Sequence, residues 1–280
     1  MKQEDWIIEV ENLCYTYDGN DERALDGMDL KIRRGRKVAF LGGNGSGKST
    51  FFLCLNGIRR PDDGRILING TPVKYTRKGL LDLRRKVGIV FQEPDDQLFS
   101  ASVYQEISFG LMNLGVDEAE AEREVERVIE ELGITPFQDR PAHALSGGQK
   151  KLVAIADILV MHPEVMILDE PTAALDPKHT RIVQDIIGKL TESGITVLMA
   201  THDMDYAYGW ADEIVLMHEG KVLRSGPSAE VCSDRQALEK TNLEMPSVLR
   251  LYEIMKEKGI LPSGDKPPAD MRELERRLSE

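Results

Sequence analysis

The sequence predicts an α/β fold built around a mostly parallel β-sheet with covering helices. Residues 165–168 and 196–200 are apolar runs without polar alternation, which is typical of strands buried on both faces. Segments with helical periodicity, residues 146–161 and 177–190, alternate with these runs, and such alternation indicates parallel strands joined by helices. A third observation is a glycine-rich segment at residues 42–50, between an apolar run and a helical pattern.

The N-terminal half adds further strands and helices to this plan. Residues 6–13 alternate between apolar and polar side chains as a strand does, and residues 18–21 are turn-forming. The other expected elements are, in chain order, a strand at 38–41, a helix at 50–58, strands at 64–70 and 86–91, and a helix at 117–132. That last helix begins at a capping aspartate, Asp117, and its apolar residues recur at helical spacing.

Composition excludes several classes of protein. The chain has 36 Lys and Arg against 48 Asp and Glu, and this net charge of −12 argues against a general nucleic-acid binder. No apolar run approaches the ~18 residues that cross a bilayer, and the first residues are polar and acidic rather than a secretory signal. Action at a membrane is therefore expected only through a partner. Three scattered cysteines indicate reduced thiols, and the histidines show no spacing typical of a transition-metal site.

The glycine-rich segment is predicted to wrap the phosphates of a nucleotide. Glycines let successive backbone N–H groups converge on phosphate oxygens, and the following helix N-terminus adds partial positive charge. Lys48 can reach the outer phosphates, and the Ser49 hydroxyl is placed to bind Mg2+. The residues assigned to this loop are Gly42, Gly43, Asn44, Gly45, Ser46, Gly47, Lys48, Ser49 and Thr50.

Two carboxylates follow the apolar strand at residues 165–168. In an enzyme with a glycine-rich phosphate loop, an acid at this place holds Mg2+, and we assign that role to Asp169. Glu170 follows, where it can polarise the water that attacks the terminal phosphate. A second phosphate-binding helix end is predicted at Ser146, Gly147, Gly148 and Gln149, where Ser146 and Gln149 form a capping box and two glycines permit close approach.

These motifs resemble those of the ATP-binding cassette (ABC) ATPases over residues 6–226. Residues 145–149 look like the signature motif of that family. The resemblance implies that Gln92 is the Q-loop glutamine that contacts Mg2+, that Asp176 belongs to the D-loop and that His202 is the switch histidine of the γ-phosphate. It also implies that Tyr17 stacks on adenine, with Tyr15 as the alternative. Ala174 departs from the glycine common in the D-loop, and Leu152 from the arginine frequent after the signature.

The family resemblance further implies a composite site. Two copies meet head to tail, so that each ATP lies between one glycine loop and the other copy's signature helix. The implied fold is a phosphate-loop ATPase core with an N-terminal antiparallel β part and a helical signature subdomain at about 93–162, together spanning residues 1–227. Residues 228–280 form a small C-terminal extension that either adds dimer contacts or is a poorly ordered tail, with a linker expected at 261–268.

Residues 91–99 narrow the resemblance to the energy-coupling-factor (ECF) group, where Pro-Asp-Asp-Gln follows the Q-loop glutamine. Neighbouring residues look closest to the CbiO family of cobalt-importer ATPases. The implied function is ATP hydrolysis, with ATP and Mg2+ bound, by a homodimer or related heterodimer at the cytoplasmic face of the membrane. The implied partners are a transmembrane coupling subunit and substrate-binding membrane subunits, with Asp95, Asp96 and Gln97 lining a groove for a coupling helix. The alternatives are a nickel or vitamin importer and, more distantly, a soluble cassette protein.

Overall fold

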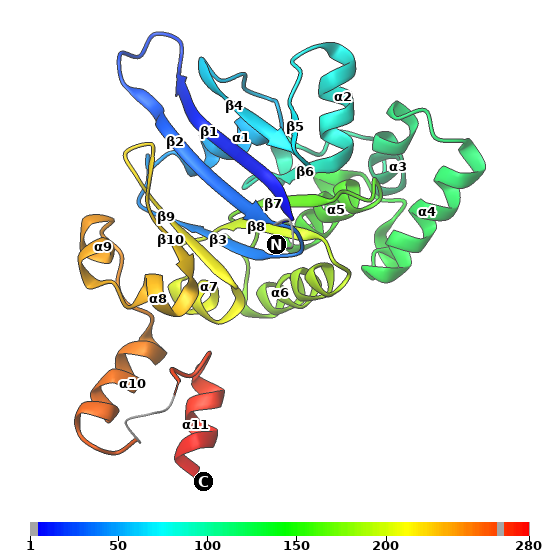
Figure 1. Cartoon of the computed structure of the whole chain (residues 1–280). Coiled ribbons are helices and arrows are strands. Elements are labelled where there is room, and N and C mark those ends of the chain that lie inside the picture. Colours follow the sequence, from blue (N-terminus) through cyan, green and yellow to red (C-terminus); the bar gives the residue numbers. More distant parts are fainter. Residues whose placement is uncertain (1–4, 262–265, 280) are drawn as a thin grey trace.

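Two β-sheets and a set of surrounding helices make up the computed structural model, which describes residues 5–261 and 266–279. The larger sheet has the strand order β10-β9-β3-β8-β7-β6, and all neighbours in it are parallel except β10 and β9 (Figure 1). Its strands are β3 (Lys37–Leu41), β6 (Val87–Val90), β7 (Val165–Asp169), β8 (Thr196–Ala200), β9 (Glu213–His218) and β10 (Lys221–Pro227). The expected mostly parallel sheet is confirmed.

A smaller antiparallel sheet lies over one side of the larger one and has the order β2-β1-β4-β5 (Figure 1). Its strands are β1 (Trp6–Thr16), β2 (Arg23–Arg33), β4 (Asp63–Ile68) and β5 (Thr71–Pro72). The pairing of β1 with β2 changes register between Val10 and Tyr15. This irregularity also interrupts the alternation of buried residues along β2 between Leu25 and Met28, and the strand was not among the expected elements.

Most helices flank the sheets, and some of them form a separate group beside β6 (Figure 1). The helices are α1 (Lys48–Leu55), α2 (Arg77–Lys86), α3 (Val103–Asn113), α4 (Glu118–Glu131), α5 (Gly147–Leu159), α6 (Pro177–Glu192), α7 (Met204–Trp210), α8 (Ser228–Cys232), α9 (Arg235–Lys240), α10 (Ser247–Glu257) and α11 (Met271–Ser279). Asp117 caps α4 by accepting a hydrogen bond from the Ala119 N–H, as expected. Among the described residues, none of these helices is long and apolar enough to span a membrane.

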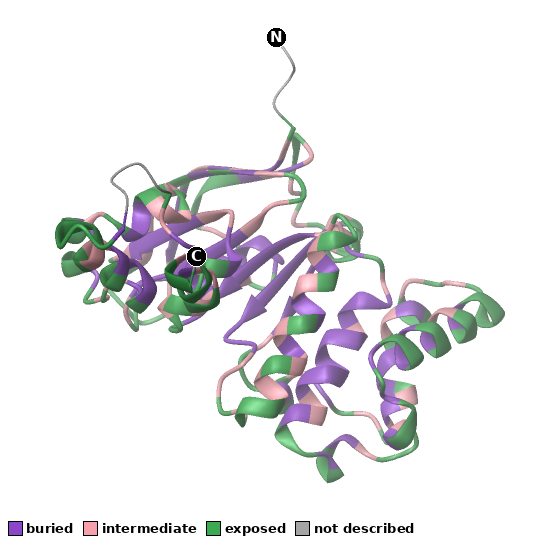
Figure 2. Cartoon of the chain, turned by 90° about the horizontal axis from the view of Figure 1, so that it is seen from below, coloured by how far each residue is buried: buried purple, intermediate pink, exposed green. Residues whose placement is uncertain are grey.

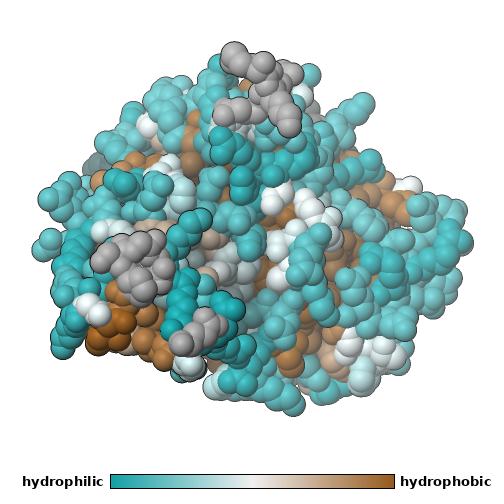
Figure 3. All heavy atoms as spheres, turned by 60° about the horizontal axis from the view of Figure 1, so that its bottom comes forward, coloured by the Kyte–Doolittle hydropathy of each residue, from teal (hydrophilic) through white to brown (hydrophobic). Residues whose placement is uncertain are grey.

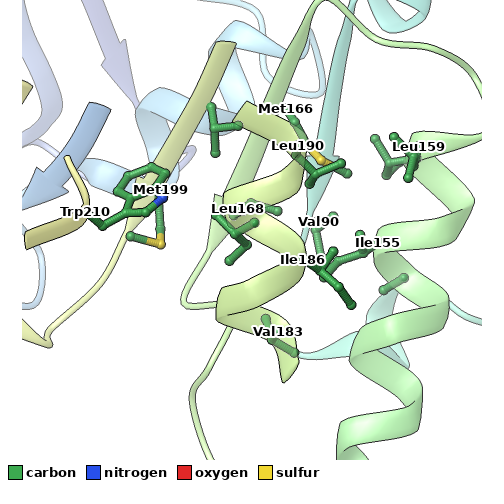
Figure 4. Packing of buried hydrophobic residues seen from close by; sticks show 14 of the residues in the cluster. Val90, Ile155, Leu159, Met166, Leu168, Val183, Ile186, Leu190, Met199 and Trp210 are labelled. Atoms are coloured by element: carbon green, nitrogen blue, oxygen red, sulfur yellow. The ribbon is translucent and has the colours of Figure 1, made fainter. Parts of the chain in front are cut away.

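Two hydrophobic clusters cover opposite faces of the larger sheet. Along β3, Val38 and Phe40 belong to the cluster shared with α1 and the smaller sheet, whereas Ala39 and Leu41 belong to the other. In Figure 4, residues of α5 and α6 such as Ile155 and Ile186 lie against the sheet. Figure 2 shows the central strands of the larger sheet almost wholly buried, whereas the edge strand β10 is mostly exposed. This rigid sheet places the residues at its strand ends in fixed positions.

The C-terminal extension is joined to the cassette core by buried side chains. Cys232 of α8, Leu238 of α9, Leu249 of α10 and Leu274 of α11 all belong to the cluster that includes the sheet residues Met166 and Leu168. Residues 262–265 of the expected linker lie outside the described residues. Figure 3 shows a face on which hydrophilic residues predominate and hydrophobic residues form separate patches.

Candidate functional site

The glycine loop between β3 and α1 has the shape of a phosphate cradle. Gly42 has φ +151°, and a Cβ there would lie 2.3 Å from the Met217 carbonyl oxygen. Gly47 has φ +101°, and a Cβ there would lie 2.7 Å from the Ala24 carbonyl oxygen. Both positions therefore require glycine, because of backbone conformation and of space. The α1 helix starts at Lys48, so its free N–H groups point into the loop.

The Lys48 ammonium is held by the loop itself. Its Nζ donates to the carbonyl oxygens of Gly42 at 2.7 Å and Gly43 at 3.2 Å, and to Ser46 Oγ at 3.3 Å. Burial lowers the pKa of Lys48, and the carboxylates of Glu170 and Asp169 act in the opposite direction. An anionic phosphate oxygen is a stronger acceptor than these neutral ones, so this ammonium is poised to bind phosphate.

A cavity of about 260 Å³ opens beside the loop. Its lining residues are Tyr17, Ala24, Asn44, Gly45, Ser46, Gly47, Lys48, Ser49, Thr50, Gln92, Asp169, Glu170 and His202. The structure thus brings most of the sequence-predicted residues to one place. Gly42 and Gly43 shape the loop without lining the cavity. Asp176 and the signature residues Ser146, Gly147, Gly148 and Gln149 are not among its lining residues.

Tyr17, rather than Tyr15, presents its ring to this cavity. The Tyr17 hydroxyl lies 3.0 Å from Thr50 Oγ1, and the Arg59 guanidinium lies 5.5 Å from the centre of the Tyr17 ring. The Tyr15 side chain is buried and meets Tyr17 edge-on, with ring centroids 5.0 Å apart. A buried ring cannot stack on a base, so the geometry favours Tyr17 of the two alternatives.

Glu170 has the strained backbone and open carboxylate of a functional residue. Its φ is +47°, a conformation that costs roughly 1–2 kcal/mol for a residue other than glycine. Its Oε1 is buried and has no hydrogen-bond partner among the described residues. The Nε2 of His202 lies 3.3 Å from that oxygen. Burial raises the pKa of Glu170, while the nearby His202 lowers it and Asp169 raises it further.

The signature segment forms a capped helix N-terminus away from the cavity. Ser146 and Gln149 make the expected capping box, with Ser146 N–H donating to Gln149 Oε1 at 3.0 Å. A Cβ at Gly147 would meet nothing within 4 Å, so this backbone is open to a ligand. A Cβ at Gly148 would lie 2.4 Å from Cδ2 of His179, so this glycine is required for packing.

The D-loop aspartate caps the next helix. Asp176 Oδ1 accepts from the N–H groups of Lys178 and His179, and Oδ2 lies 2.5 Å from His179 Nδ1. Bonds to His179, first through its backbone, lower the pKa of Asp176. Ala174 has φ +59°. Glycine adopts this left-handed conformation most easily, which is a physical reason for the glycine common at this place in the D-loop and makes Ala174 the exception.

Gln97, expected to line a partner groove, is half-buried, and its side-chain amide is bonded inward. Its Nε2 donates inward to the carbonyl oxygen of Ala154 at 3.0 Å and to Asp157 Oδ2 at 2.9 Å. Its side chain therefore braces the segment after β6 against α5. Asp95 remains on the surface, where Lys150 donates to it at 2.6 Å, and Asp96 is exposed.

Sequence reasoning missed two residues at the site. Ala24 of β2 lines the cavity, and its carbonyl faces Gly47. Lys151 of α5 is buried and donates to backbone carbonyls beside Gln92 and Glu170. Its place on the apolar face of α5, one turn from Gly148 and from Ile155, is a signal that could have identified it. A lysine on the buried face of a helix requires partners for its charge.

The donor set fits Mg2+ bound beside a nucleotide. Ser49, Gln92 and Asp169 supply oxygens around one cavity, and Mg2+ prefers oxygen ligands, of which phosphates and water provide the rest. The buried, unpartnered Oε1 of Glu170 is a further acceptor facing the same space. Within the described ranges there is no cluster of three or more His, Cys, Asp and Glu residues that could hold a metal alone. The metal and the nucleotide are therefore expected to bind together.

Comparison with known proteins gives the same result as the site. Residues 25–173 match the family model described as ABC transporter. The chain is 48% identical over 257 residues to the Energy-coupling factor transporter ATP-binding protein EcfA3 of Clostridium perfringens, covering 91% of this chain and 90% of that protein.

Solved structures share the fold over most of the chain. One is cbiO1 of Clostridium perfringens, described as part of the ABC transporter complex cbiONQ; it has a TM-score of 0.75 and 45% identity, and the match covers 90% of this chain and all of that one. Another is the ATP-binding cassette MJ0796, a dimer in a post-hydrolysis state with ADP and Pi, with a TM-score of 0.72 and 28% identity over 79% of this chain and 98% of that one. The chain therefore belongs to the ABC transporter family and is one of its ATP-hydrolysing cassettes.

Proposed function

We propose that this chain is the ATPase subunit of an ECF-type importer and energises the uptake of a transition-metal ion through separate membrane subunits. The ion that we propose first is Co2+. The observation that carries the hydrolytic role is the buried Oε1 of Glu170, which accepts no hydrogen bond within the described structure and lies 3.3 Å from His202 Nε2, in the cavity that Lys48 and Asp169 also line. The ECF assignment rests on the names of the relatives and on residues 91–99.

Catalysis in this proposal is positioning and charge neutralisation by the chain's own residues. Tyr17 holds the base, the glycine loop and Lys48 hold the phosphates, and His202 contacts the terminal phosphate. Glu170 orients the attacking water and accepts its proton at Oε1. Ser49, Gln92 and Asp169 would hold Mg2+, which supplies charge to stabilise the phosphate oxygens when bound.

A dimer completes the site. The signature backbone at Gly147 is exposed and lies outside the cavity that its own chain forms, so it is free to meet a second copy's ATP. ATP bound at each interface joins the two copies, and hydrolysis lets them separate. The second copy is an identical chain in a homodimer and a related ATPase in a heterodimer.

The docking surface for the membrane subunit lies on α3 and on the segment before it. Phe99 and Phe109 are 69% and 45% exposed and meet edge-on, with ring centroids 5.0 Å apart. Met112, also on α3, is 65% exposed, and the acidic pair Asp95 and Asp96 lies nearby in sequence. An apolar surface with an acidic rim suits an amphipathic helix with basic ends. The chain would then sit at the cytoplasmic face of the membrane through its partners.

Three experiments test separate parts of the proposal. Glu170→Gln should abolish steady-state ATP hydrolysis while ATP binding persists, and hydrolysis at the wild-type rate would contradict the role of Glu170. The reconstituted complex with its membrane subunits should take up Co2+ in an ATP-dependent manner and in preference to Ni2+. Preference for Ni2+ or a vitamin would transfer the assignment to those importers.

The double variant Asp95→Asn with Asp96→Asn should weaken assembly with the membrane subunit in a pull-down. Assembly at the wild-type level would contradict the proposed docking surface.

A further inference from the structure

Lys151 carries a buried ammonium whose hydrogen bonds all go to backbone carbonyls in the described structure. The residue is 2% exposed and lies in α5, one turn after Gly147. Its Nζ donates to the carbonyl oxygens of Phe91 at 3.3 Å, of Gln92, and of Glu170 at 3.3 Å. Burial lowers the pKa of Lys151, and the carboxylates of Glu93, Asp169 and Glu170 act in the opposite direction.

These three carbonyls belong to two separate segments of the hydrolytic site. Phe91 and Gln92 follow β6, and Glu170 follows β7. The lysine itself lies in the helix whose N-terminus is the signature segment. The Lys151 side chain therefore connects Gln92, which is assigned to Mg2+, and Glu170, which is assigned to the attacking water. It also ties both of them to the helix that faces the second copy's ATP. Charge-assisted hydrogen bonds of this kind are stronger than neutral ones and specify geometry.

The contact with Glu170 acts on a strained residue. The Glu170 backbone has φ +47°, its N–H donates to the Ala200 carbonyl at 3.1 Å, and its carbonyl accepts from the Ala173 N–H at 3.2 Å and from Lys151. A non-glycine residue keeps such a conformation only where its surroundings hold it. Since the carboxylate direction follows the backbone, the loss of one support lets the carboxylate move away from its productive place.

We propose that Lys151 is a positioning residue for ATP hydrolysis, which fixes the backbones of Gln92 and Glu170 relative to the signature helix. The inference rests on the roles proposed above for those two residues. The adjacent Lys150 provides a matched contrast, because its ammonium lies near the surface and contacts the exposed carboxylate of Asp95. Both are lysines of the same helix, and only one reaches the hydrolytic site.

The test compares Lys151→Met with Lys150→Met in the full chain, with kcat and the KM for ATP measured where each variant is folded. We expect Lys151→Met to lower kcat about 100-fold, as a misplacement of about 1 Å does, with KM changed less than about 3-fold. Lys150→Met should keep the wild-type values. If Lys151→Met does not fold, Lys151→Gln, which retains a donor on a shorter chain, takes its place with the same expected pattern.

A double-mutant cycle with Glu170→Gln separates positioning from a general structural effect. Single-turnover hydrolysis by Glu170→Gln should fall by much less than 100-fold when Lys151→Met is added, because Lys151 acts in part through Glu170 and only its support of Gln92 is left to lose. A full multiplicative loss in the double variant, or an equal rise in KM and fall in kcat, would overturn the proposal. If Glu170→Gln alone hydrolyses ATP at the wild-type rate, the proposed function fails. If Glu170→Gln alone is inactive and Lys151→Met is fully active, only the role of Lys151 fails.

Discussion

The Nε2 atom of His202 lies 3.3 Å from Oε1 of Glu170, so the two residues at the ends of neighbouring strands β8 and β7 form one unit. The nearby imidazole lowers the pKa of Glu170 against the rise caused by burial. The balance between the two determines the pH at which the carboxylate can accept a proton from water.

The first prediction concerns the pH dependence of hydrolysis. A general base works when deprotonated, so activity falls as the pH drops through the pKa of Glu170, which lies above its ordinary 4.5. His202→Ala removes an influence that lowers this pKa, so the acidic limb of the kcat profile should move to higher pH. The profile of kcat against pH for both proteins measures the shift. A limb that stays in place or moves to lower pH contradicts the pairing.

The second prediction concerns Lys48 and ATP affinity. Lys48→Met removes the ammonium group and with it the charge-assisted hydrogen bonds to phosphate. The binding free energy of ATP should therefore weaken by about 2 kcal/mol, which is a loss of affinity of roughly 30-fold. Titration calorimetry with ATP and Mg2+ measures the loss. Lys189→Met, on the exposed face of α6, serves as the control. Unchanged affinity in Lys48→Met would rule out the phosphate role.

The third prediction separates the two signature glycines. Gly148→Ala places a methyl group against the His179 ring and should lower the thermal midpoint, whereas Gly147→Ala meets no atom within 4 Å and should not. Overpacking of this kind should lower the free energy of unfolding of Gly148→Ala by about 1–3 kcal/mol. Adding His179→Ala to Gly148→Ala should recover most of the stability. Equal midpoints for the two glycine variants would show that the close contact is absent in solution.

The fourth prediction concerns Asp157, whose buried carboxyl accepts from Gln97. Burial raises the pKa of Asp157 to about 7 from 3.8, so the folded chain keeps a proton that the unfolded chain releases between these values. Stability therefore falls as pH rises through this window, by up to about 4 kcal/mol. Asp157→Asn resembles the protonated form and should flatten the dependence. Urea unfolding at pH 5 and pH 8, with exposed Asp185→Asn as control, measures it, and an unaltered dependence in Asp157→Asn would contradict the assignment.

The sequence predicted the elements that carry local motifs and missed those that depend on distant partners. The glycine loop, the strand before Asp169 and the signature helix have short, ordered patterns, and each lies where it was expected. Strand β2 was not predicted, although residues 28–32 alternate between buried and exposed side chains and only the part before Met28 is irregular. Helix α2 was missed because it is short and mostly polar, and Leu83 is the one buried residue among its described side chains.

The same distinction applies to the candidate site. Gln92 and His202 meet in the cavity because they follow β6 and β8, parallel strands whose ends share one edge of the larger sheet, whereas Tyr17 follows β1 of the smaller sheet. The inward hydrogen bonds of Gln97 could not be predicted, since they depend on Asp157 and on a carbonyl of α5. Lys151 was overlooked because its partners are backbone carbonyls, which carry no residue-specific signal.

The central claim is that two copies complete each ATP site, and nucleotide retention tests it most directly. Glu170→Gln with ATP and Mg2+ should form a complex of two chains that retains two ATP molecules through gel filtration. Adding Gly147→Glu, which places a negative charge at the signature backbone, should abolish retention while each chain still binds ATP. ATP retained by the Gly147→Glu variant, or no retained ATP in Glu170→Gln alone, would contradict the composite site.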